Sequence, residues 1–102
     1  MSDLNTLLLE GTLVDNVLCD PCANNPYARL LISNQIEQNG LVTESVFEIG
    51  VRGNIARACY KMLSKGDRIR AVGKLIKINW NEDYEQYIIF GEHIEKQMGK
   101  EN

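Results

Sequence analysis

Apolar and polar residues alternate along most of the chain, which is the pattern of β-strands with one buried face. The alternation is clearest in residues 43–51 (TESVFEIGV), where Phe47, Ile49 and Val51 fall on the same side. Further segments with strand character lie at residues 4–14, 27–33, 67–80 and 87–95. We therefore expect five strands, with Phe47 facing the core.

One segment has the periodicity of a helix with a single apolar face. Its apolar positions are Ile55, Cys59, Met62 and Leu63, with Ala56 and Ala58 beside them. Asn54 is a favourable N-cap residue, and Gly66 stands where a C′ glycine ends a helix. The pattern predicts one helix, with Cys59 packed in the core as a small apolar residue.

The remaining segments have the composition of turns and loops. Residues 15–26 hold two prolines, three asparagines and two aspartates, and residues 35–40 end in Asn-Gly, the strongest short hairpin signal. Gly11 and Gly73 interrupt the first and fourth strands, where we expect a bulge or a bend. The element order is β-β-β-α-β-β, which predicts an all-β OB-fold, a five-stranded Greek-key barrel with one helix between strands 3 and 4.

Length and composition fit one small domain. The chain has 102 residues, of which 44% are hydrophobic and 25% charged. We expect a single OB-fold domain over residues 1–98, followed by a short C-terminal end at 99–102. No apolar run approaches the ~20 residues that span a bilayer. The first residues have no basic segment, and the three cysteines are an odd number, so we expect a cytoplasmic protein without a disulfide framework.

Charge is distributed unevenly along the chain, although its sum is only −3. Residues 1–51 hold seven acids and one basic residue, whereas residues 52–77 hold eight basic residues and one acid. A basic segment of this kind can attract nucleic acid. It can equally be a solvated surface whose cations pair with acids across the fold.

The motif CDPC (Cys19 to Cys22) has the spacing of a redox pair or of half a zinc site. A low-pKa redox cysteine needs a helix N-terminus, but the motif is followed by ANNP, which disfavours a helix. A zinc site needs four ligands, and the other candidates are Cys59, on the apolar helix face, and His93, in a strand. We therefore expect a loop here, with no metal and no cofactor.

Several short motifs occur in a defined order. They are Gly53-Asn54-Ile55-Ala56, Leu63-Ser64-Lys65-Gly66-Asp67-Arg68-Ile69, Val72-Gly73-Lys74-Leu75, Trp80, and the N-terminal set Asn5, Leu7, Leu9, Gly11 and Leu13. Together with the ending IIFGEHIE, they resemble the bacterial single-stranded DNA-binding protein family over about residues 4–96.

This resemblance implies binding of single-stranded DNA without strong sequence preference, by stacking of bases and by phosphate contacts, in DNA replication, repair or recombination. Trp80 matches the family's stacking tryptophan. The expected phosphate contacts are Arg29, Arg52, Arg70, Lys74 and Lys77. The resemblance also implies a homo-oligomer, either a tetramer or a dimer.

The sequence departs from the family at several positions. Commonly aromatic positions hold Arg52, Val46 and Gln38, and often basic positions hold Ile76 and Ile78. Arg52 could replace part of the lost platform, because a guanidinium can lie flat on a base. We expect the remaining aromatic residues of the second half to pack in the core or on the barrel face; they are Tyr60, Tyr84, Tyr87 and Phe90. The ending EKQMGKEN has no acidic-hydrophobic tip, so we expect replication or repair proteins to bind barrel surfaces if they bind at all.

Other functions remain open. The chain could be an OB-fold adaptor similar to the primosomal replication protein, which binds proteins first and nucleic acid weakly or not at all. The same surface could also bind RNA. We do not expect an enzyme, because no Ser-His-Asp set is evident and RGNIARA lacks the spacing of a phosphate-binding loop.

Overall fold

Five strands and one helix make up the computed structural model of the chain, which describes residues 2–81 and 84–98, with the backbone alone at 79–81 and 84–85. The elements are β1 (Leu7–Leu13), β2 (Tyr27–Gln38), β3 (Leu41–Arg52), α1 (Gly53–Met62), β4 (Arg68–Asn81) and β5 (Tyr84–Gln97). Their order is the predicted one. β1 is shorter than expected, whereas β2, β3 and β5 are longer.

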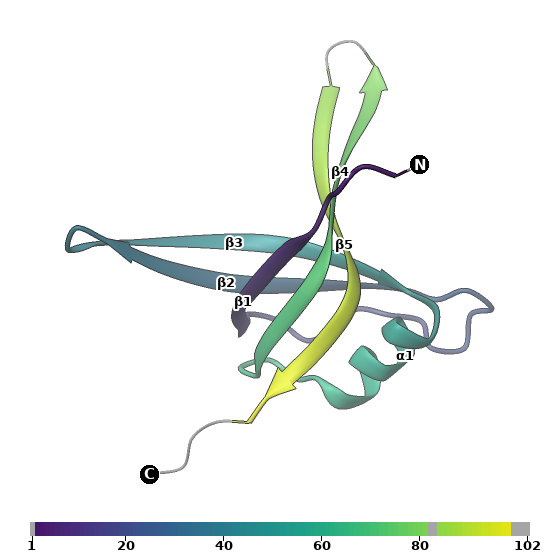
Figure 1. Cartoon of the computed structure of the whole chain (residues 1–102). Coiled ribbons are helices and arrows are strands. Elements are labelled where there is room, and N and C mark those ends of the chain that lie inside the picture. The colour runs from purple at the N-terminus through teal and green to yellow at the C-terminus, as the bar shows by residue number, and fades with distance from the viewer. Residues whose placement is uncertain (1, 82–83, 99–102) are drawn as a thin grey trace.

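The strands close into a barrel in the order β1-β2-β3-β5-β4 (Figure 1). Neighbouring strands are antiparallel except β3 and β5, which run parallel and pair at Ile49–Ile89 and Gly50–Phe90. α1 lies between β3 and β4 in the chain and packs against β2, β3 and β5. This architecture confirms the predicted OB-fold. No helix within residues 2–81 and 84–98 is long and apolar enough to cross a membrane.

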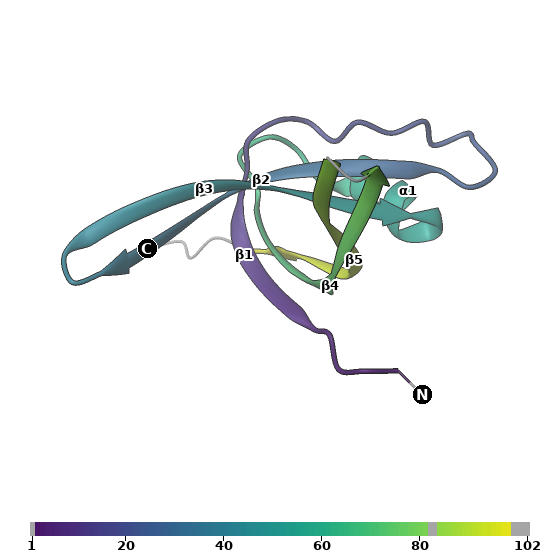
Figure 2. The same cartoon turned by 90° about the horizontal axis from the view of Figure 1, so that it is seen from above.

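Two hairpins extend beyond the barrel, the β2–β3 arm and the β4–β5 arm (Figures 1 and 2). β2 and β3 pair along their whole length, from Tyr27–Arg52 to Gln38–Leu41, whereas β1 pairs with β2 near Leu13 alone. The outer part of the β2–β3 hairpin is therefore a two-stranded ribbon. The β4–β5 hairpin extends in a different direction, so the two arms diverge as they leave the barrel (Figure 1).

The turn of the β2–β3 arm is tighter than predicted. Asn39 and Gly40 both have positive φ, 54° and 78°, as a two-residue type I′ hairpin turn requires. Residues 35–38, which we expected in the turn, continue β2 and pair with β3. That part of the prediction was wrong because the Asn-Gly pair reverses the chain without further turn residues.

The bend predicted in β4 is present at Gly73. There the register of β4 with β5 shifts, so that Gly73 faces Gly91 while Val72 faces His93, and Glu92 becomes the extra residue of a β-bulge. Gly11, by contrast, lies in a continuous register with β4, so the bulge expected there is absent. At Gly11 the backbones of β1 and β2 instead approach each other closely, because a Cβ on Gly11 would lie 2.5 Å from the carbonyl oxygen of Ser33.

α1 begins earlier than predicted, and Asn54 is not its N-cap. Arg52 is the N-cap residue, and no side chain caps the helix there. Pairing of β3 with β2 continues through Arg52, after which Gly53, with φ 65°, turns the chain and donates its N–H to the carbonyl of Pro26 at 2.9 Å. Asn54 therefore lies in the first turn, where its Oδ1 accepts a hydrogen bond from Arg57 at 2.9 Å.

The C-terminus of α1 also differs from the prediction. Leu63 is the C-cap residue with an extended backbone, and its N–H donates to the carbonyl of Cys59. Gly66 has a positive φ of 96° but lies three residues beyond that cap, where its N–H donates to the carbonyl of Leu13 at 2.8 Å. The helix ends early because the extended Leu63 turns its side chain into the core.

The core lies inside the barrel and beneath α1. Its buried apolar residues are Leu13, Val17, Ala28, Leu30, Ile32, Ile49, Val51, Ala56, Cys59, Leu63, Ile69, Ala71 and Ile89. Phe47 packs against this core, as the alternation in β3 predicted. Met62, which we placed on the buried helix face, is instead 63% exposed. Cys59 is 4% exposed, and the prediction of a core cysteine is confirmed.

We expect the Cys59 thiol to be inert in the folded protein. Burial raises its pKa to about 11, so the reactive thiolate is scarce near pH 8. With a disulfide-forming aromatic thiol reagent, the exposed Cys22 should react rapidly, whereas Cys59 should react only after unfolding in urea. In the Cys22→Ser variant the rapid phase should disappear. Loss of that phase in Cys59→Ser instead would contradict the expectation.

Candidate nucleic-acid interface

An apolar groove lies on the outer face of the barrel where β2 and β3 meet β4 and β5. It has a volume of about 350 Å³ and is lined by Tyr27, Arg52, Ile76, Ile78, Ile88 and Phe90. The strand register brings these residues together, because Ile76 lies directly opposite Ile88 and Tyr27 directly opposite Arg52. The groove thus joins positions far apart in the sequence, and two of them, Ile76 and Ile78, are the positions that departed from the basic family pattern.

Tyr27 and Arg52 form a stack at one end of the groove. The guanidinium carbon of Arg52 lies 5.2 Å from the centroid of the Tyr27 ring, within the range of a cation–π interaction. The ring in turn lies over Gly50, where a Cβ would come within 2.9 Å of ring atoms Cε2 and Cζ. A guanidinium held over a ring can offer its outer face to another planar group.

Sequence reasoning named Arg52 but missed Tyr27. The available signal was its position at the start of a strand, two residues before Arg29, on the face that alternation turns away from the core. That signal acquires meaning only once the β2–β3 register is known, because the register places Tyr27 opposite Arg52. Phe90, expected to pack in the core or on the barrel face, is partly buried and lines the groove.

Trp80 continues the strand that forms one wall of the groove. Its backbone belongs to β4, at the alternate position beyond Ile76 and Ile78, where the register with β5 shifts again between Asn79 and Asn81. The side chain of Trp80, like that of Tyr84, lies outside the described residues.

The other two aromatic candidates lie away from the groove. Tyr60 on α1 and Tyr87 on β5 are 47% and 60% exposed, so neither is a core residue. Neither lines the groove.

Carboxylates in the described part of the chain pair with Arg29, Arg70 and Lys74, which are predicted phosphate contacts. Arg29 donates to Glu48 from Nε at 2.9 Å and also from Nη2. The Lys74 ammonium lies 3.1 Å from a carboxylate oxygen of Glu92. The third pair joins Arg70 to Glu10 at 3.0 Å.

The pairing changes the acidity of two of these groups. Hydrogen bonding and the charge of Glu48 raise the pKa of the Arg29 guanidinium, which keeps it protonated. The pKa of Glu10 is lowered, first by the hydrogen bond from Gln97 and then by Arg70. Both effects favour the charged forms, so each pair of opposite charges adds little net charge to the protein surface.

Lys77 lies on the other face of the β4–β5 ribbon from the groove. It faces Tyr87 across the strand pair, while its neighbours Ile76 and Ile78 line the groove. A nucleic-acid strand that contacted both the groove and Lys77 would therefore have to cross the edge of the β4–β5 ribbon.

The basic segment also contains a residue with a structural role. Arg57 on α1 donates to the backbone carbonyls of Pro21, Ala23 and Asn24, at 3.2, 2.9 and 3.3 Å. These bonds attach the CDPC loop to the helix. Part of the positive charge of the basic segment, that of Arg57, therefore stabilises the fold.

The CDPC motif lies in a loop, as predicted. Asp20 starts a turn, in which its carbonyl accepts from Ala23 at 3.3 Å and its side chain accepts from Cys22 at 3.1 Å. Cys19 packs against the core while Cys22 is exposed, and both are free thiols. In the part of the chain that the structure describes, no three His, Cys, Asp or Glu residues are placed to hold a metal ion.

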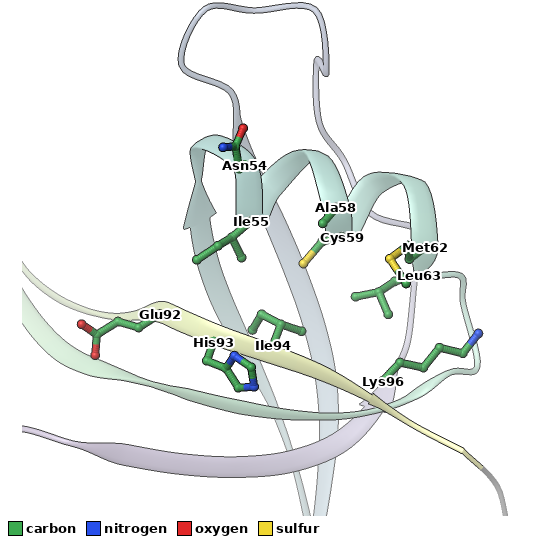
Figure 3. Close-up of a pocket in the computed structure, with 10 residues that line it drawn as sticks. All are labelled: Asn54, Ile55, Ala58, Cys59, Met62, Leu63, Glu92, His93, Ile94 and Lys96. Atoms are coloured by element: carbon green, nitrogen blue, oxygen red, sulfur yellow. The ribbon is translucent and has the colours of Figure 1, made fainter.

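A second groove, of about 290 Å³, separates α1 from β5 (Figure 3). Ile55 and Cys59 point from the helix toward the strand, and Ile94 points toward the helix. The charged residues at its edge bond elsewhere, Glu92 to Lys74 and Lys96 to Asp67. Its lining includes no aromatic residue except His93, so it offers a weaker platform for bases than the groove beside Tyr27.

Comparison with known proteins finds similarity in structure alone. No protein-family model matches the sequence, and no curated protein matches it. The wild-type single-stranded DNA-binding protein from Thermus aquaticus aligns over 95% of this chain, with a TM-score of 0.81 and 21% identity. The chain spans 52% of that protein's length.

Two further structures align over nearly their whole lengths. The small single-stranded DNA-binding protein from Streptomyces coelicolor has a TM-score of 0.73 at 15% identity, with 96% of this chain and 95% of that one covered. The SSB domain of a Synechococcus protein has a TM-score of 0.69 at 16% identity, with 92% and 97% covered. The chain therefore shares the fold of bacterial single-stranded DNA-binding proteins, as the motifs indicated.

We expect Gly50→Ala to destabilise the fold by about 1–3 kcal/mol, because the added Cβ overpacks the Tyr27 ring. In a Tyr27→Ala background the same change should cost much less, since the ring is absent. Urea unfolding of the four proteins in this cycle measures the coupling. An equal cost of Gly50→Ala in both backgrounds would show that Tyr27 does not lie on Gly50.

Proposed function

We propose that the chain binds single-stranded DNA without strong sequence preference, using the groove beside Tyr27. The observation that carries the proposal is the stack of Arg52 on Tyr27 at the edge of an apolar groove on the barrel's outer face. A base can lie on the free face of the guanidinium, and the aliphatic walls accommodate a base of any type. The shared fold with the Thermus aquaticus and Streptomyces coelicolor proteins supports this reading.

Trp80 extends the binding path along β4 in this proposal, and its ring stacks on a neighbouring base. Arg29 and Lys74 flank the groove and contact phosphates. Lys77 and Arg70 contact phosphates of the DNA strand where it leaves the groove. The departures from the family then have a consistent consequence, since one Arg–Tyr stack replaces several aromatic platforms. We therefore expect weak binding by each subunit.

We also propose that the protein acts as a homo-oligomer, a dimer or a tetramer, in DNA replication, repair or recombination. Weak sites on one assembly bind a single strand together, and the effective concentration of the second site raises the overall affinity without new contacts. Analytical ultracentrifugation at micromolar concentration should give a mass of two or four chains. A stable monomer at that concentration would contradict this part of the proposal.

The second candidate is a protein-binding adaptor, favoured by the carboxylate pairing of Arg29, Arg70 and Lys74. Cations already neutralised on the protein attract phosphate weakly. The two functions make different predictions for nucleic-acid binding, so one titration separates them.

We expect an oligo-dT of ~35 nucleotides to quench the fluorescence of Trp80, the single tryptophan, and to bind more weakly as salt increases. The slope of log K against log salt should be about −0.7 for each phosphate contacted by a cation whose charge no carboxylate already offsets. The same titration with oligo-U measures any preference for DNA over RNA. No quenching, and no binding by anisotropy at low salt, would contradict the proposal and leave the adaptor.

Tyr27→Leu should weaken oligo-dT binding by about 5- to 150-fold, because Arg52 then lacks the ring that supports it as a base platform and each stacked base is worth about 1–3 kcal/mol. Tyr60→Leu is the matched control, since Tyr60 is an exposed aromatic on α1 outside the groove. Equal effects of the two substitutions would exclude the groove as the binding site.

A further inference from the structure

Each flank of the groove carries one ion pair, and each cation in these pairs is a proposed phosphate contact. On β2 and β3, Arg29 donates to Glu48 through Nε and Nη2. On β4 and β5, Lys74 Nζ lies 3.1 Å from Glu92 Oε1. The four side chains are about one third to one half exposed, so water and ligands reach both pairs.

Strand register places these cations at the two ends of one row across the barrel wall. Arg29 lies opposite Gly50, Gly50 beside Phe90, and Phe90 opposite Lys74. Phe90 lines the groove, and the Tyr27 ring lies over Gly50. A DNA strand that follows this row therefore crosses the groove between the two cations.

The two carboxylates hold the cations in the way that a phosphate would. Carboxylate and phosphate both present two oxygen acceptors to a guanidinium, and both accept from a lysine ammonium. Glu92 reaches Lys74 because it is the extra residue of the bulge beside Gly73. Glu48 lies on the same face of β3 as Gly50 and Arg52, two residues from Gly50, and from there it reaches Arg29.

We propose that Glu48 and Glu92 act as built-in competitors for the two phosphate subsites at Arg29 and Lys74, and that they set the affinity and the salt dependence of single-stranded DNA binding. This inference rests on the proposed function. It assigns to each acid the role of an affinity-determining residue, although neither lines the groove.

The proposal has a quantitative consequence for counterion release. A paired cation contributes no net charge to the interface, so the phosphate that it contacts keeps its condensed counterion. Replacing the acid by its neutral amide leaves the cation with a full charge. Each such change should therefore make the slope of log K against log salt steeper by about 0.7 for single strands.

The test compares Glu48→Gln, Glu92→Gln and the double variant with the parent protein, by oligo-dT anisotropy at several salt concentrations. Each single change should strengthen binding about two- to five-fold at low salt, since exposed ion pairs are weak. The double variant should combine the two effects, with a slope steeper by about 1.4. The control is Glu95→Gln, the same charge change on β5, at a carboxylate that lies 3.9 Å from His93 and outside both ion pairs.

A second cycle assigns the gain to a particular cation. Arg29→Gln should remove the gain of Glu48→Gln and leave that of Glu92→Gln unchanged, because Arg29 and Lys74 lie at opposite ends of the row. If the parent binds but the two acid variants behave as Glu95→Gln does, the competitor role is wrong and the proposed function stands. If no variant binds oligo-dT at low salt, both are wrong.

Discussion

The rest of the structure depends on Gly50, which pairs with strands on both sides and lies under the Tyr27 ring. Gly50 pairs with Arg29 of β2 and with Phe90 of β5, and the latter is part of the short parallel contact that closes the barrel. The absence of a side chain at Gly50 also leaves the space that the Tyr27 ring occupies. Gly50 therefore takes part in both features, because it pairs in the contact that closes the barrel and its lack of a side chain makes room for the Tyr27 ring beside the groove.

Strand order explains why the basic segment does not form one basic surface. β4, which carries four of the segment's eight cations, lies between β1 and β5, and both of these neighbours carry acids. Arg70 therefore meets Glu10 on one side, and Lys74 meets Glu92 on the other. Of the two readings left open by the charge distribution, pairing across the fold accounts for these residues. The proposed function depends on how readily a phosphate displaces those acids.

The CDPC loop has a structural role in this fold. Its turn is closed by the side chain of Asp20, and its backbone carbonyls are held by Arg57 from α1. The loop ends at the buried Pro26, whose carbonyl accepts from Gly53 at the start of the helix. Together these bonds fix the segment that leads into Tyr27, so the loop positions the first residue of the groove.

Local patterns determined most of the fold. Alternation, one helical stripe and an Asn-Gly turn were sufficient to predict five strands, the helix between β3 and β4, the inward Phe47 and the buried Cys59, because each depends on neighbours within a few residues. Helix ends and strand lengths were less accurate, since pairing with β2 holds Arg52 and Gly53 in place. Tertiary structure alone decided the site. Tyr27, Arg52 and Phe90 meet only because the register of three strands brings them together, and no spacing in the sequence encodes which carboxylate reaches Arg29 or Lys74.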